Sequence, residues 1–222
     1  MCGRFTITLE AADLQLDLGI ANMPADWQPR FNVAPTQLVA TLVDASSRQA
    51  EWLRWGLIPS WAKDPTIASS LINARSETVA EKPSFRQAFN RRRCLILADG
   101  FFEWKRSASQ KGPAQPYYFQ RIDKKPFAFA GLWETWKPPE GELVRSCTLI
   151  TCAANEIVSP VHERMPVMLS GESMWNWLEL SSPDALKAIL RPYPSDVMTA
   201  FPISRLVNNA KIESPDIVKP LS

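Results

Sequence analysis

The sequence lacks most of the features that place a chain in a specialised class. No apolar run approaches the ~18–20 residues that a membrane-spanning helix requires. The first twenty residues contain no basic leader with an apolar core and a cleavage site, so we expect a cytoplasmic protein with no membrane partner. No repeat or low-complexity tract is visible. A hydrophobic content of 45% and a charged content of 22% are typical of a globular chain.

The sequence also contains few potential metal ligands and carries little net charge. The only histidine is His162, and the four cysteines at positions 2, 94, 147 and 152 form no C-x-x-C pair. This pattern predicts free thiols in an intracellular protein, with no metal site and no cofactor. The net charge is only +2, so any affinity for nucleic acid must come from arginines and lysines clustered on one face.

What the sequence does contain is a series of strand-like runs, rich in Val, Ile, Phe, Trp and Tyr and separated by turn residues. They are 38–43, 52–57, 94–104, 117–121, 127–133 and 143–152. Helices are expected over 10–18 with Gly19 as C-cap, over 84–92, over 173–180, and over 185–190 behind an N-cap at Ser182. Because helices do not alternate with strands, the pattern indicates an α+β fold with a mixed or antiparallel sheet core and peripheral helices. No linker divides the chain, so residues 1–222 are interpreted as one domain.

Chemistry is suggested first by the start of the chain, Met-Cys-Gly-Arg-Phe. Methionine is normally removed before a small residue, which would leave Cys2 with a free α-amine beside its thiol. Their ordinary pKa values, ~7.7–8.0 and ~8.5, leave both groups partly nucleophilic at neutral pH. Such a 1,2-aminothiol condenses with an aldehyde to an imine and then closes a thiazolidine ring. The alternative is that cysteine is simply a small second residue, and the pentapeptide alone does not decide between the two.

Further polar residues stand beside proline, glycine and aromatic residues in five downstream segments. These are R-F-N-V-A-P at 30–35, W-G-L-I-P-S-W at 55–61, L-I-N-A-R-S-E-T at 71–78, A-D-G-F-F-E-W-K at 98–105 and V-H-E-R-M-P at 161–166. Asn73 and Arg75 are two residues apart, so in an extended segment both side chains project from one face.

Together with the M-C-G-R start, these segments resemble the SRAP family, whose SOS-response-associated peptidase domains process abasic sites. The motifs occur in the family's order from residue 2 to about 166, and V-N-N at 207–209 resembles a tail motif. The resemblance implies an α+β fold with a curved, largely antiparallel, barrel-like sheet. It also implies that the chain senses abasic sites in single-stranded DNA and forms a thiazolidine crosslink that shields the site during the DNA damage response.

The same resemblance implies roles for individual residues. Cys2 is similar to the family's nucleophile, and Asn73 to an amide that donates hydrogen bonds in the abasic pocket. Glu103 and His162 are similar to an acid–base pair beside the adduct. Arginines that contact phosphates are expected at Arg4, Arg75 and Arg164, and we also assign Asn32, Pro35, Trp61 and Trp104 to the DNA-binding surface.

Each role has a physical reason and a simpler alternative. Opening the closed abasic sugar requires proton exchange near neutrality, which suits a histidine with its ordinary pKa of about 6.5. Glu103 lies between Phe102 and Trp104, where desolvation would raise its pKa. The alternatives are a structural histidine, an acid paired with an arginine, and a turn-stabilising Asn73. For the arginines, the alternative is an ordinary ion pair.

Single-stranded DNA is the expected partner because a single strand bends into a pocket at lower cost than a duplex. Trp61 and Pro35 offer flat apolar surfaces for the flanking bases. We expect a monomer with a lyase-like crosslinking activity and a possible autoproteolytic removal of Met1, located on the nucleoid after DNA damage in a bacterium. Two rivals remain: an N-terminal-nucleophile cysteine hydrolase acting on peptides or amides, and a non-enzymatic DNA-binding module in which Cys2 is dispensable.

Overall fold

Two sheets and four short helices form the fold in a computed structural model that describes residues 2–106 and 112–221. The smaller sheet has the strand order β13-β8-β7-β1-β2. Its strands are β1 (Phe5–Ile7), β2 (Arg30–Val33), β7 (Gly100–Lys105), β8 (Gln115–Arg121) and β13 (Met198–Pro202). All of its pairings are antiparallel.

The larger sheet closes on itself. Its strands are β3 (Leu38–Leu42), β4 (Ala50–Trp55), β5 (Asn73–Arg75), β6 (Arg93–Ala98), β9 (Phe127–Trp136), β10 (Val144–Ala153), β11 (Arg164–Pro166) and β12 (Met168–Leu169). The pairings β10–β4, β4–β3, β3–β6, β6–β9 and β9–β10 form a ring, so these five strands make a small barrel. Only β4 and β5 run parallel to β10. The predicted α+β class with a curved, largely antiparallel, barrel-like core is therefore confirmed.

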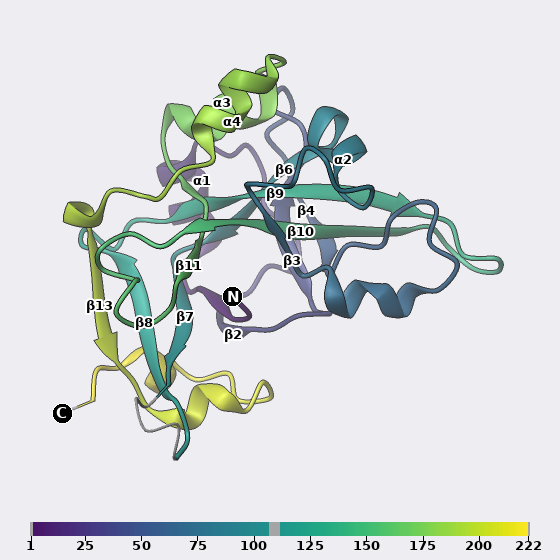
Figure 1. The fold of residues 1–222 in the computed structure, drawn as a ribbon. Helices are drawn as coiled ribbons and strands as arrows, with labels where there is room; N and C mark the ends of the chain where they lie inside the picture. The colour runs from purple at the N-terminus through teal and green to yellow at the C-terminus, as the bar shows by residue number, and fades with distance from the viewer. Residues whose placement is uncertain (1, 107–111, 222) are drawn as a thin grey trace.

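Helices cover the barrel at its periphery: α1 (Ala11–Leu18), α2 (Arg86–Arg91), α3 (Glu172–Glu179) and α4 (Pro183–Ile189). Figure 1 shows α2, α3 and α4 above the larger sheet, with β7, β8 and β13 extending below it beside the C-terminal segment. The predicted caps are confirmed: Gly19 ends α1 in the left-handed conformation, and the Ser182 side chain accepts a hydrogen bond from the Ala185 N–H. Four 3-10 helices lie at Pro65–Ser70, Ser195–Val197, Arg205–Asn208 and Pro215–Val218.

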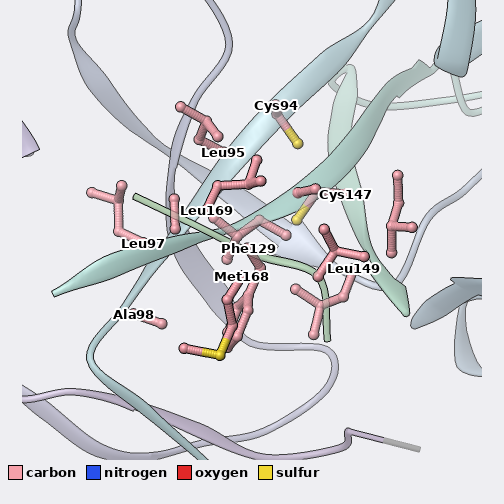
Figure 2. Packing of buried hydrophobic residues seen from close by; sticks show 14 of the residues in the cluster. Cys94, Leu95, Leu97, Ala98, Phe129, Cys147, Leu149, Met168 and Leu169 are labelled. Atoms are coloured by element: carbon pink, nitrogen blue, oxygen red, sulfur yellow. The ribbon is translucent and has the colours of Figure 1, made fainter. Parts of the chain in front are cut away.

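The core fills the barrel with aliphatic and aromatic side chains. Figure 2 shows Leu95, Phe129, Leu149 and Met168 packed together with Cys94 and Cys147, all of them buried. Cys152 is buried as well, and burial raises the pKa of all three thiols. These cysteines are therefore core residues that hold their protons at neutral pH.

The strand predicted over 94–104 is in fact two strands, and this expectation was wrong. β6 ends at Ala98 and β7 begins at Gly100 in the other sheet. The break comes from Asp99, whose carboxylate accepts hydrogen bonds from the Thr6 hydroxyl at 2.5 Å and the Thr8 hydroxyl at 2.6 Å. A Cβ at Gly100 would lie 2.2 Å from the Tyr118 hydroxyl, so only glycine fits there. The turn at Asp99 thus transfers the chain from the barrel to the smaller sheet and aligns β7 with β1.

Candidate active site

Cys2 lies just before β1, with its side chain fully buried. Its thiol donates a 3.5 Å hydrogen bond to the Arg4 carbonyl, and the same carbonyl accepts from the Phe102 N–H at 3.0 Å. These contacts hold the start of the chain against β7. Burial, and next the negative charge of Glu103, raise the pKa of the Cys2 thiol above its ordinary value. The thiol is therefore protonated at rest, and Glu103 is its electrostatic neighbour.

Asn73 secures the other side of Cys2. Its Nδ2 donates a 2.8 Å hydrogen bond to the Cys2 carbonyl, and it stands at the first position of β5, opposite Leu149 of β10. The Asn73 Oδ1 is buried and has no hydrogen-bond partner among the described residues. A buried amide oxygen without a donor is costly, so this atom is available to a donor group of a ligand.

Glu103 lies on β7 with 2% of its surface exposed. Burial is the largest influence on this carboxyl and raises its pKa to about 7. A carboxyl with that pKa both donates and accepts protons at neutral pH. Along β7 the side chains of Phe101 and Glu103 project from one face of the sheet, and those of Phe102 and Trp104 project from the other. Phe101 stacks on Phe119 in the core, with the ring centroids 4.9 Å apart, so Glu103 follows a core residue on the same face.

His162 faces Glu103 across a cavity of about 620 Å³. Both residues line it, together with Trp104, Lys105, Arg106, Pro160, Val161 and Glu163. The Arg164 N–H lies 2.9 Å from the Nδ1 of His162. Partial burial is the first cause that lowers the pKa of His162. The ring is therefore neutral, and we assign its proton to Nε2 because Nδ1 accepts from the backbone.

The predicted phosphate contacts lie in different environments. Arg75 is exposed, at the end of β5. The Arg164 side chain is only 11% exposed, and its guanidinium forms two hydrogen bonds with the Glu77 carboxylate at 2.6 and 2.9 Å. It also donates to the Thr151 carbonyl at 2.6 Å. Arg164 is thus held in one orientation by Glu77, a partner that no sequence motif indicates.

Three further predicted DNA contacts, Arg4, Asn32 and Trp104, have partners within the protein. Arg4 donates to the Asn32 side-chain oxygen at 2.8 Å and to the Val207 carbonyl at 2.7 Å. Asn32 is fully buried, and its Nδ2 lies 3.0–3.3 Å from the carbonyl oxygens of Val207, Asn209 and Ile212. Trp104 Nε1 donates to the Asn208 side chain at 2.8 Å. Through these bonds the three residues hold the C-terminal segment, residues 203–218, against the site.

Two predicted base-stacking residues stand on loops. Trp61 is 57% exposed. Its loop is fixed because Trp136 Nε1 donates to the Ala62 carbonyl at 2.7 Å, and the Ser60 N–H donates to buried Glu134 at 3.3 Å. Pro35 is half-buried in a turn whose Gln37 N–H donates to the Ala34 carbonyl at 3.3 Å.

Lys105 and Arg106 are additions that the sequence interpretation missed. Both are exposed, both line the cavity of Glu103 and His162, and neither belongs to an ion pair within the described part of the chain. Their position directly after F-F-E-W could have indicated this location, because the residues that follow a strand ending at a cavity lie at its rim.

Other possible sites contain none of this constellation. A cavity of about 780 Å³ borders Thr8, Asp99 and Tyr118 and includes no predicted site residue. Within residues 2–106 and 112–221, no three His, Cys, Asp or Glu side chains gather closely enough to hold a metal ion. No helix in the same residues combines the length and apolar character needed to cross a membrane.

Comparison with known proteins gives consistent matches. A family model described as SOS response associated peptidase (SRAP) matches residues 1–210. The chain is 42% identical to the abasic site processing protein YoqW of Bacillus subtilis, over 99% of each chain. It is 32% identical to the abasic site processing protein HMCES of Xenopus tropicalis, over 97% of this chain and 77% of that one. A crystal structure of a Bacteroides thetaiotaomicron protein superposes with a TM-score of 0.87 at 25% identity, over the whole of both chains.

Proposed function

The chain belongs to the SOS response associated peptidase family, and on that premise we propose that it captures abasic sites in single-stranded DNA covalently through Cys2, after Met1 is removed. The observation that carries the proposal is the grouping around Cys2. Asn73 binds its carbonyl, Glu103 with a pKa of about 7 lies beside it, and His162 shares Glu103's cavity. Relatives named abasic site processing proteins support the same substrate.

The proposed reaction forms two bonds to the sugar's C1′ and releases one water. The neutral α-amine of Cys2 attacks the aldehyde carbon of the opened sugar and gives a carbinolamine. Glu103 protonates its hydroxyl, water leaves, and an imine remains. The Cys2 sulfur then adds to the imine carbon while its proton passes to the nitrogen, closing a thiazolidine. The raised pKa of the thiol fixes this order, because a protonated thiol is a poor first nucleophile.

His162 suits the preceding step, in which the closed sugar opens. Its neutral ring donates a hydrogen bond from Nε2–H to the ring oxygen and stabilises the negative charge that develops there as the C1′–O4′ bond breaks. The C1′ hydroxyl gives its proton to the Glu103 carboxylate, which passes it on to the ring oxygen. The Asn73 oxygen accepts a hydrogen bond from the amine or a sugar hydroxyl. Arg75 and Arg164 bind phosphates, while Trp61 and Pro35 stack against flanking bases. Arg4, Asn32 and Trp104 contribute through the C-terminal segment that they hold, and Arg4 and Trp104 also border the DNA.

The finer features of the proposal follow from this chemistry. The activity is lyase-like, because the carbinolamine forms the imine by eliminating water, and reversal adds that water back. The Met1–Cys2 bond is the one peptide bond that must be cleaved, in part by the protein itself. The chain acts as a monomer with one domain over residues 1–222, in the cytoplasm and on damaged DNA. A cysteine hydrolase is disfavoured, because its first step needs a thiolate and burial raises the pKa of the Cys2 thiol.

The test is a mixture of the Met1-free protein with an abasic single-stranded oligonucleotide, followed by denaturation and mass spectrometry. We expect a stable adduct of protein plus DNA minus one water, formed without borohydride. Cys2→Ser should give at most a hydrolysable adduct. Retaining Met1 should abolish crosslinking and leave non-covalent DNA binding intact. An adduct that needs borohydride, or one that forms at full rate with Met1 in place, would contradict the proposal.

A further inference from the structure

A second cavity continues from the one that contains Glu103 and His162. Its volume is about 390 Å³, and it shares Lys105, Pro160 and Val161 with the first cavity. Its other lining residues are Tyr117, Glu156, Ile157, Met198, Thr199 and Ala200. Since the two cavities have three walls in common, they form one depression that runs from the catalytic residues to Tyr117.

The register of β7 and β8 explains this continuity. Glu103 and Tyr117 are directly opposite each other in the antiparallel pair, so their side chains emerge on the same face of the sheet. Lys105 is two residues beyond Glu103 and shares that face. The half-buried Tyr117 ring is thus a neighbour of the catalytic acid, one strand away.

The lining of the second cavity suits a nucleotide. Tyr117, Ile157, Val161 and Ala200 provide a half-buried apolar surface with one aromatic ring. Lys105 lines both cavities, whereas Arg106, Glu103 and Glu163 line the first alone and Glu156 lines the second alone. The charged side chain at the junction is therefore the ammonium of Lys105, and the phosphate that joins an abasic residue to its neighbour has to pass there.

We propose that the second cavity binds the nucleotide on one side of the abasic residue, with its base stacked on Tyr117 and the linking phosphate on Lys105. This inference rests on the proposed function and specifies how the strand leaves the site. Cavities of ~300–1,000 Å³ commonly hold ligands of this size, and aromatic stacking is a sequence-tolerant way to bind a base. The subsite therefore favours a base at this position without selecting its identity.

The experiment uses three short single strands, each with one abasic residue. In the first, both neighbouring nucleotides are normal. In the other two, a stable, aldehyde-free spacer without a base replaces either the 5′ or the 3′ neighbour. The concentration for half-maximal crosslinking rate is measured for each strand with the Met1-free protein. Removing the base that occupies the second cavity should raise this concentration about 5- to 150-fold, the factor that corresponds to ~1–3 kcal/mol of stacking per base, and the Tyr117 variants identify which neighbour that base belongs to.

Variants assign the effect to these residues. Tyr117→Leu should bind the normal strand as weakly as wild-type protein binds the spacer strand. The affinity of this variant should not fall further when the spacer strand replaces the normal strand. Tyr117→Phe keeps the ring and should retain the preference. Lys105→Gln should lower the slope of log affinity against log salt by about one, while Lys187→Gln on α4 should leave it unchanged. The pH profile of crosslinking by Tyr117→Leu should match wild type, which shows that Glu103 is undisturbed.

The outcomes separate the two proposals. If wild-type protein crosslinks no abasic strand, the proposed function fails. If it crosslinks them all but ignores removal of either neighbouring base, the subsite alone is wrong. The subsite is also wrong if Tyr117→Leu weakens the normal and spacer strands equally, because that result indicates a general structural role.

Discussion

At the scale of single residues, Glu103 is notable because burial raises the pKa of its carboxyl to about 7. Its proposed role can be tested by one substitution. Glu103→Gln keeps the shape of the side chain but cannot exchange a proton. We expect crosslinking at pH 7 to slow by ~10²–10⁴-fold, the usual contribution of general acid–base catalysis. Reversal should slow by a similar factor, because the same group serves both directions. Glu142→Gln, in an exposed loop, is the charge-matched control. Unequal effects on the forward and reverse rates would contradict the shared role.

The raised pKa of Glu103 also sets a pH dependence of folding. The folded protein keeps the Glu103 proton up to pH about 7, whereas an unfolded glutamate releases it near ~4.3. The contribution to stability is therefore fully present below pH ~4.3 and is lost as pH rises to about 7. Chemical denaturation of wild type and Glu103→Gln across this window should show wild type losing stability relative to the variant. Parallel curves would contradict the shift.

Sequence motifs named candidate residues that lie close together in the fold, but they did not show which of them are buried or paired with other side chains. Cys2, Asn73, Glu103 and His162 could be named because each stands in a distinct short motif. The burial of Asn32 depends on a segment 175–180 positions away in the chain, and the pairing of Arg164 with Glu77 on a residue 87 positions away. Sequence spacing contains no information on such long-range partners, so these side chains could not be distinguished from exposed DNA contacts.

At the scale of elements, the turn after β2 has an unusual backbone. Thr36 has a φ of 74°, although a β-branched residue rarely adopts the left-handed region. The turn is held by hydrogen bonds from the Thr36 N–H to the Trp55 carbonyl at 2.8 Å and from the Ala34 N–H to the Gln37 side chain at 3.0 Å. The fold thus imposes a conformation that its threonine disfavours, next to Pro35.

Replacing Thr36 should therefore stabilise the protein. The left-handed conformation costs an L-residue ~1–2 kcal/mol, and the greater freedom of unfolded glycine offsets ~0.5–1 of that gain. We expect Thr36→Gly and Thr36→Asn to raise the free energy of unfolding by up to about 1 kcal/mol, as measured by urea denaturation. Thr36→Val keeps the branching and should bring no gain. A gain with valine equal to that with glycine would show that backbone strain is not the cause.

Elements were predictable in proportion to their length and regularity. The runs that became β9 and β10 have continuous β-branched and aromatic character and were located correctly, as were α1 and α4 through their caps. Strands β1, β5 and β11 have three residues each, too few to show a period of two. These short strands exist because longer neighbours provide pairing partners. They include β5, which positions Asn73, so the site depends on elements that local sequence signals do not reveal.

For the whole molecule, the central feature is the attachment of the C-terminal segment to the start of the chain. Ile203, Val207 and Ile217 of this segment are buried against Phe102 and Tyr118, and Arg4 and Asn32 bind its carbonyl oxygens. The side chains of Phe101 and Glu103 project from the face of β7 opposite to that of Phe102. The segment therefore supports the sheet behind Glu103.

Asn32→Ala tests this support. It leaves buried carbonyl oxygens and the Arg4 guanidinium without their amide partner, so the free energy of unfolding should fall by ~1–3 kcal/mol or more. Hydrogen exchange should show residues 205–212 losing protection first, while Met198–Pro202 stays protected by its pairing with β8. The exposed Asn90→Ala is the control. Uniform loss of protection throughout the chain would indicate general destabilisation instead.

This attachment has a consequence for biogenesis. Arg4 and its partner Val207 are 203 positions apart, so a ribosome exposes the amino terminus long before it makes the segment that completes the site. During most of translation the proposed aminothiol of Cys2 therefore lacks the contacts that fix its position in the folded protein and the complete surroundings of Glu103. We therefore expect the growing polypeptide to react with cellular aldehydes only as an ordinary weak nucleophile, and the proposed capture of damaged DNA to become efficient only after the finished chain is released.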